Sequence, residues 1–173
     1  MDVVLATVAS EFSDIRDLES FVRALVRLLL AALLGGLLGL ERELTGKPAG
    51  LRTHMLVALG SAMFMLAARR AGLDEEGVSR VIQGLLAGVG FLCAGSILKA
   101  DDQEHVYGLT TAAGLWMTAA IGLAAGLGLD ALAVLSTLLT LGILLLEIPL
   151  RNVIQNQRRR RRAAVDDGGP GAS

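Results

Sequence analysis

The chain has 173 residues, of which 53% are hydrophobic and 19% charged, and its mean hydropathy is +0.59. This composition is unusual for a water-soluble domain and indicates a membrane protein, whose surroundings are the lipid bilayer. The single cysteine excludes an intrachain disulfide, and with only two histidines beside it a structural zinc site within one chain is not expected. The net charge of −1 does not indicate nucleic acid as a partner, and we expect none.

Membrane spans are predicted where acidic and basic residues are absent for long enough to cross about 30 Å of hydrocarbon, which takes about 20 helical residues. The first interval, 28–40, becomes long enough when Arg23 and Arg27 extend their side chains to the membrane surface. The acidic residues ahead of this interval argue against a cleaved signal peptide. Four further intervals follow in chain order: 53–68, 81–98, 106–129 and 131–146.

Each span is expected to be helical, because hydrocarbon offers the backbone no hydrogen-bond partners. The predicted fold class is therefore all-α, a polytopic membrane protein that forms a compact bundle of five transmembrane helices. Gly128 and Asp130 leave so few residues between the last two spans that these must form a tight antiparallel hairpin.

Lysine and arginine are distributed unequally between the two ends of the predicted bundle. Ten lie in the tail and in the connections that share its side, whereas the other side has six when Arg23 and Arg27 are included. The positive-inside rule then places the N-terminus outside and the C-terminus in the cytoplasm. We expect an extracytoplasmic segment over 1–20, the five-helix domain over 21–150, and a basic, partly disordered cytoplasmic tail over 151–173.

Small residues repeat at a spacing of four within several spans, which lets helix backbones approach closely in lipid. These pairs predict tight packing within the chain, and a face between copies of a homo-oligomer is the alternative use. The glycines concerned are Gly35 and Gly39, Gly84 and Gly88, and Gly122 and Gly126, with Ala58 and Ala62 as a similar pair.

The first connection, residues 41–54, carries several charges that adjoin hydrocarbon on both sides, so each should have a partner. Glu41 and Glu43 stand at a helix C-terminus, where the macrodipole disfavours anions. They are expected to meet Arg42, Lys47, Arg52 or a bound cation. One interpretation is an ion-paired turn that fixes how two helices meet. The other is a metal site, because Mg²⁺ retains waters and uses one or two carboxylates.

Other polar residues are interpreted as structural. His54 is expected at the membrane interface as a polar cap, Trp116 as a packing anchor within its span, and Cys93 as a small apolar filler. Phosphate-binding, metalloprotease and nucleophile-elbow motifs are missing from the sequence. We therefore expect no enzymatic activity and no catalytic residues.

Three blocks of the sequence closely resemble the membrane domain of the MgtC/SapB family. They read GLERELTGKPAGLRTHMLVALGSAMF over 39–64, RVIQGLLAGVGFLCAGSILK over 80–99 and GLTTAAGLWMTAAIGLAAGLG over 108–128. The resemblance implies a bacterial inner-membrane protein linked to growth in low magnesium and, in pathogens, to virulence. It also implies regulation through other membrane complexes, such as the F-type ATP synthase or a transporter.

The resemblance carries over the polar residues of the first connection and of the start of the fourth span. These form a predicted functional cluster: Glu41, Arg42, Glu43, Arg52, Thr53, Thr110 and Thr111. The chain departs from the family at Cys93, where glycine is usual, and at Met117, where some virulence-type members have cysteine. The larger cytoplasmic C-terminal domain of those members is not expected here.

Two hypotheses follow for the function. The first is a non-enzymatic modulator of a membrane complex or of Mg²⁺ homeostasis, with no certain cofactor. The second is a cation carrier or channel for Mg²⁺, with a polar site at the cytoplasmic ends of the first, second and fourth spans and with Glu41 and Glu43 as its metal ligands.

Overall fold

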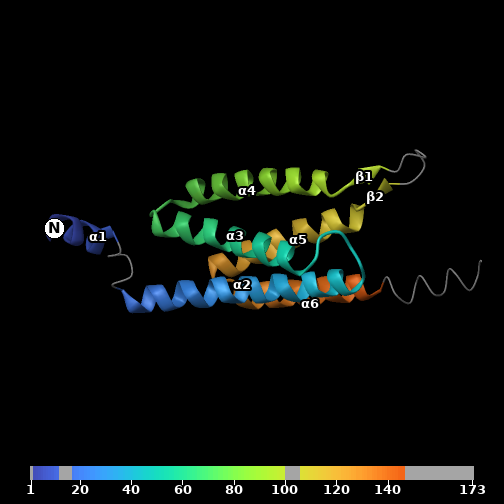
Figure 1. Cartoon of the computed structure of the whole chain (residues 1–173), viewed down its shortest axis with the longest axis horizontal. Coiled ribbons are helices and arrows are strands. Elements are labelled where there is room, and N and C mark those ends of the chain that lie inside the picture. The colour runs from blue at the N-terminus through green and yellow to red at the C-terminus, as the bar shows by residue number, and fades with distance from the viewer. Residues whose placement is uncertain (1, 12–16, 100–105, 147–173) are drawn as a thin grey trace, which may run out of the picture.

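The computed structural model describes residues 2–11, 17–99 and 106–146. In chain order the elements are α1 (Asp2–Glu11), α2 (Leu18–Leu44), α3 (Leu51–Arg70), α4 (Glu75–Gly95), β1 (Leu98–Lys99), β2 (Val106–Tyr107), α5 (Leu109–Leu127) and α6 (Asp130–Leu145). Helices α2 to α6 lie side by side along the long axis, with α4 at one edge of the bundle and α2 and α6 at the opposite edge (Figure 1). The predicted tail, 151–173, lies outside the described residues.

The compact all-α bundle predicted from the sequence is confirmed. Within the described chain, α2, α3, α4 and α5 are long and apolar enough to cross a membrane, whereas α6 has 16 residues and is shorter than a usual span. The count of five spans therefore stays a prediction. The expected tight hairpin between the last two helices is also confirmed, since α5 ends at Leu127 and α6 begins at Asp130.

The predicted spans differ from the observed helices at their ends. The first predicted span, 28–40, is the middle of a 27-residue helix, α2, whose last turns include charged residues. The fourth was predicted to begin at 106, but residues 106–107 pair instead with Leu98 and Lys99 as a short antiparallel ladder. Gly108 follows with φ +93, which a side chain would strain, and α5 starts only after this turn. Helix α1 lies in the predicted extracytoplasmic segment, where no helix was foreseen.

The centre of the bundle is formed by α2, α3 and α5, whose backbones approach closely at small residues. A Cβ atom built on Gly35 of α2 would lie 2.7 Å from Ala58 Cβ, and one on Gly122 of α5 would lie 2.7 Å from Ala58 Cα. One turn further along, a Cβ on Gly126 would lie 2.8 Å from Ala62 Cα. These distances leave no room for a side chain, so glycine is required for α3 to lie between its two neighbours.

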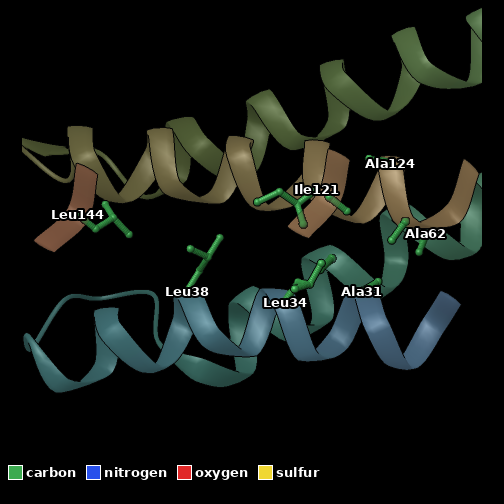
Figure 2. Packing of buried hydrophobic residues seen from close by; sticks show 10 residues of the cluster. Ala31, Leu34, Leu38, Ala62, Ile121, Ala124 and Leu144 are labelled. Carbon is green, nitrogen blue, oxygen red and sulfur yellow. The ribbon is translucent and has the colours of Figure 1, made fainter. Parts of the chain in front are cut away.

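Larger apolar side chains fill the remaining space between the helices. Figure 2 shows Leu34 and Leu38 of α2 directed toward Ile121 of α5, all three of which are buried. The outward faces are apolar too: Phe91 of α4 is 82% exposed, and Trp116 is 46% exposed. Trp116 is therefore not the packing anchor that was predicted. Large apolar side chains on the outside are expected where hydrocarbon, rather than water, surrounds the helices.

Arg27 connects two helices near one end of the bundle. Its guanidinium donates to the Gly126 carbonyl oxygen at 3.3 Å, near the end of α5. A Cβ on Gly128 would lie 2.7 Å from Arg27 Cζ, and Gly128 itself has φ +80. The cation thus lies at the negative end of the α5 dipole and ties α2 to α5.

The start of α2 carries a local hydrogen bond outside the spans. The hydroxyl of Ser20 donates to the carboxylate of Asp17, the residue just before the helix. This hydrogen bond lowers the pKa of Asp17 below its ordinary value, because it stabilises the charged form.

Candidate functional site

Buried polar residues gather at one end of the bundle, where α2 ends and α3 and α5 begin. Glu41 and Arg42, in the last turn of α2, are 9% and 0% exposed. The Arg42 guanidinium binds the Glu41 carboxylate through two hydrogen bonds: Nε donates to Oε2, and Nη2 donates to Oε1 at 2.7 Å. Both oxygens of the carboxylate are therefore engaged by the neighbouring residue.

The burial of this ion pair has an energetic consequence. Removing two charges from water costs several kcal/mol per ion, roughly, and their mutual attraction offsets this only with good hydrogen-bond geometry. The two-point contact between Glu41 and Arg42 provides such geometry. Losing either charge would leave the other in a medium of low dielectric constant.

His54 lies inside the bundle and not at the membrane interface as predicted. It is 0% exposed, and its Nδ1 lies 2.7 Å from the Thr118 hydroxyl of α5. A Cβ on Gly39 of α2 would lie 2.9 Å from His54 Cβ, and one on Gly114 of α5 would lie 3.6 Å from Cε1. The imidazole is thus enclosed by α2 and α5, and it joins α3 to α5 by a hydrogen bond within the apolar interior.

The Thr118 hydroxyl lies between His54 and the backbone of its own helix. Its oxygen is 2.8 Å from the Gly114 carbonyl oxygen and 2.7 Å from His54 Nδ1. The one hydroxyl hydrogen can serve either contact, and the tautomer of the imidazole decides which. Nε2 of His54, which is also buried, has no hydrogen-bond partner among the described residues.

Glu43 has a different role from Glu41. It is exposed, and its Oε2 accepts a hydrogen bond from the backbone N–H of Leu51 at 2.8 Å. An anion at a helix N-terminus is favourable, so Glu43 caps α3 from the end of α2. A Cβ on Gly50 would lie 2.8 Å from the same Oε2, which explains the glycine before the helix.

The predicted functional cluster is divided between the interior and the surface. Thr111 is buried with Glu41 and Arg42, whereas Arg52, Thr53 and Thr110 are exposed, as is Glu43. Of the cations proposed as partners for the two glutamates, Arg42 meets Glu41, whereas Arg52 forms neither an ion pair nor a side-chain hydrogen bond with the described residues.

A family model described as the MgtC family matches residues 28–153, which include all the buried polar residues above. The chain belongs to the MgtC family. The match begins within α2 and covers α3 to α6 in full. No solved structure matches the chain.

Three curated relatives illustrate the similarity. The "Putative magnesium transporter YhiD" of Escherichia coli is 43% identical over 127 residues, which are 69% of this chain and 58% of that protein. Protein SrpB of Synechococcus elongatus is 47% identical over 126 residues, 66% of this chain and 69% of that protein. Protein MgtC of Brucella abortus is 41% identical over 133 residues, 77% of this chain and 55% of that protein. The chain spans little more than half the length of YhiD and of the Brucella protein.

The carboxylates of Glu41 and Glu43 in this MgtC-family chain are already bound to other groups. Both oxygens of Glu41 bind Arg42, and one oxygen of Glu43 binds the Leu51 N–H. In the described residues no group of three or more His, Cys, Asp or Glu is arranged to hold a metal ion. A Mg²⁺ ion at Glu41 would have to displace the Arg42 guanidinium.

The His54–Thr118 contact was missed by sequence reasoning, although two signals for it exist. His54 stands four residues before Ala58, and Thr118 stands four residues before Gly122. Residues four apart share one face of a helix, so each polar residue extends a row of small residues by one turn. Because the two rows pack against each other, the polar residues at their ends meet.

Proposed function

We propose that this protein is a non-enzymatic bacterial inner-membrane protein that modulates another membrane complex or Mg²⁺ homeostasis. One observation carries the proposal: the buried polar side chains are bound to other groups of the chain. Glu41 binds its neighbour Arg42 within α2, and His54 of α3 binds Thr118 of α5, whereas the cavity between α3 and α4 is lined by apolar residues apart from Ser61. Polar groups fixed in this way stabilise a scaffold and leave the surface for contacts with a partner.

The surface available for such contacts lies at the same end of the bundle. Glu43, Thr53 and Thr110 are exposed there, beside the buried pair. The excess of lysine and arginine at this end supports placing it in the cytoplasm, with the N-terminus outside. A fusion reporter at each terminus of the full chain tests this orientation. An active cytoplasmic reporter at the N-terminus and not at the C-terminus would reverse it.

Crosslinking in native membranes tests the modulator proposal. The full chain, tagged and expressed in its own host, is crosslinked, solubilised and recovered, and its companions are identified by mass spectrometry. We expect one membrane protein, such as a subunit of an ATP synthase or a transporter, in fixed ratio to the chain. Charge reversal by Glu43→Lys should reduce this recovery, and Glu19→Lys on the opposite end of α2 is the control. Repeated recovery of the bare chain, or of copies of itself alone, would contradict the proposal.

Mg²⁺ transport is the second candidate, because the Escherichia coli relative is named as a magnesium transporter. Under this alternative Glu41 and Glu43 bind the ion after Arg42 withdraws. Liposomes containing the purified chain and a Mg²⁺-sensitive dye inside measure the flux. Transport should be lost with Glu41→Gln and kept with Glu19→Gln, an exposed carboxylate on the same helix. No flux from a correctly folded wild-type protein rejects this candidate.

A further inference from the structure

A groove of about 700 Å³ lies between α3 and α4. We call it the α3–α4 groove; it is formed by Leu56, Gly60 and Phe64 of α3 and by Gly84, Gly88 and Leu92 of α4, with neighbouring apolar residues. The polar residue in its lining is Ser61, and its hydroxyl already donates to the Val57 carbonyl at 2.8 Å. The groove therefore offers nothing for water to bind, and hydrocarbon is its favoured content.

Three glycines keep the groove open. No atom lies within 4 Å of a Cβ atom built on Gly60, Gly84 or Gly88. This contrasts with Gly35 and Gly122, whose missing side chains are replaced by the backbone of α3. The α3–α4 glycines instead leave space that the side chains of the described residues do not fill.

The length of the groove distinguishes between occupants. On α3 it runs from Leu56 to Phe64, which at 1.5 Å per residue is about 12 Å. A membrane-spanning helix from a second chain would need a contact along much of the hydrocarbon thickness of about 30 Å. About 12 Å is close to the depth of a single leaflet, so the dimensions fit an acyl chain of one leaflet better than a whole helix.

A positive charge stands at one end of the groove. Arg52 precedes Leu56, Gly60 and Phe64 in a row of residues four apart, so it shares the face of α3 that lines the groove. It is exposed and lacks an ion pair within the described residues. A cation in the first turn of a helix is disfavoured by the macrodipole, and an external anion beside it would relieve this.

From these observations we propose that the α3–α4 groove binds one acyl chain of an anionic glycerophospholipid, whose phosphate is bound by Arg52. The lipid belongs to the leaflet at the N-terminal end of α3. The apolar groove selects for hydrocarbon, and the arginine selects for negative charge, so the two parts of the site can be tested separately.

Native mass spectrometry of the full chain tests the proposal, with phosphatidylglycerol and phosphatidylcholine added in equal amounts. The wild type should retain phosphatidylglycerol preferentially. Gly88→Leu places a side chain in the groove without a clash, since no atom lies within 4 Å of its Cβ. It should abolish retention of both lipids. Gly142→Leu on α6 is the matched control, because its Cβ is equally free of neighbours but lies outside the groove.

Arg52→Gln tests the charged part of the site. It should lower the preference for phosphatidylglycerol over phosphatidylcholine about five-fold, the effect of one cation near an anionic lipid surface, and still allow phosphatidylcholine to bind. Arg80→Gln, at an exposed arginine paired with Glu76, is the control and should keep the preference. An unchanged preference in the Arg52 variant overturns the assignment of Arg52.

Folding of each variant is checked by size-exclusion profile and thermal stability, with Gly60→Leu as a second groove-filling variant. Photoreactive phosphatidylglycerol, used on the wild type alone, should label groove residues of α3 and α4. Labels elsewhere, or equal lipid retention by the groove-filled variants, overturn the proposal. A change from dimer to monomer in those variants, with lipid retention unchanged, would show that a second copy occupies the groove instead.

Discussion

Helix α3 presents two faces that carry small residues at similar spacing, and the two faces have opposite outcomes. Toward α2 and α5, Ala58 is enclosed between Gly35 and Gly122, and no further atom would fit. Toward α4, Gly60 faces Gly84 and Gly88 across an open groove. The comparison shows that a small-residue pair predicts where two backbones can approach, but not that they do.

The physical reason lies in the solvent. Lipid tails are as apolar as the side chains, so apolar surface alone gives two helices in a bilayer little reason to close a gap. On the side of α3 that packs against α2 and α5, which we call the filled side, His54 also bonds to Thr118 of α5. The two neighbours of α3 are joined in turn, because Arg27 of α2 bonds to the α5 backbone. No side-chain hydrogen bond joins the described groove residues of α3 to those of α4, so hydrocarbon can take the place of protein contacts there.

The largest loss of stability is expected from breaking the buried Glu41–Arg42 ion pair, which lies at the end of the α2–α3 contact. Glu41→Gln removes the carboxylate that binds Arg42 and should lower the free energy of unfolding by about 3–5 kcal/mol. Glu19→Gln, which breaks the exposed Glu19–Arg23 pair on the same helix, should cost less than about 1 kcal/mol. Denaturant titration in detergent micelles measures both. Equal losses would mean that the Glu41–Arg42 pair behaves as a surface pair.

A matched glycine pair tests the two faces of α3 directly. Gly122→Ala forces a methyl group against the Ala58 backbone and should cost about 1–3 kcal/mol. Gly84→Ala meets no atom within 4 Å and should change stability by about 0.5 kcal/mol or less. Thermal unfolding of the purified variants gives the comparison. If Gly84→Ala is as damaging as Gly122→Ala, then α4 has a close partner in solution.

Loss of the hydrogen bond between His54 and Thr118 should reduce stability by a smaller amount. Thr118→Val removes the hydroxyl that bonds to His54 Nδ1 and should cost about 0.6–1.7 kcal/mol, the mean and the largest value measured for hydrogen bonds between membrane helices. Thr137→Val is the control, because that buried hydroxyl donates to Ala133 within its own helix. Thr118→Ser should restore most of the loss. A Thr137 variant that is equally unstable would show that packing, not the link to His54, causes the loss.

The smallest expected effect concerns the opposite end of the α2–α5 contact. Gly128→Ala and Gly72→Ala both place a side chain at positive φ, with φ +80 and +71, but only at Gly128 does the new methyl group meet Arg27. The first variant should therefore be less stable than the second by about 0.3–1 kcal/mol, the value of a cation at a helix C-terminus. Equal melting temperatures for the two variants would show that the contact of Arg27 with the end of α5 does not contribute to stability.

Much of the fold could be predicted because each span is long, apolar and free of charge. The breaks at Gly128 and at the polar loop before Leu51 also follow from the sequence, since glycine and charged residues end such spans. The β1–β2 pairing could not be foreseen, because Val106 and Tyr107 are apolar and read as part of the next helix. Trp116 was misplaced for a similar reason: an apolar residue within a span suits the interior and the lipid-facing surface equally well.

The candidate site was predicted in part. The sequence indicated that Glu41 and Arg42 need partners, because charges next to hydrocarbon are costly. It gave Arg42 as one of several cations that Glu41 could meet, without choosing between them, and it did not indicate that Glu43 would cap α3. The sequence does not show which side-chain rotamers two adjacent residues adopt, and these rotamers decide whether the residues bind each other. A helix cap likewise depends on where the next helix begins, which the sequence does not fix to the residue.

By itself, the sequence determined that this chain is a helical membrane protein of the MgtC family, because composition and long matching segments do not depend on how helices are arranged. The tertiary structure decided which faces of those helices meet, and therefore that His54 is enclosed and Arg52 exposed. In a bilayer a helix face can be apolar whether it packs against another helix or faces lipid, so hydropathy does not show which faces meet. Close backbone contacts and a few polar links make the choice.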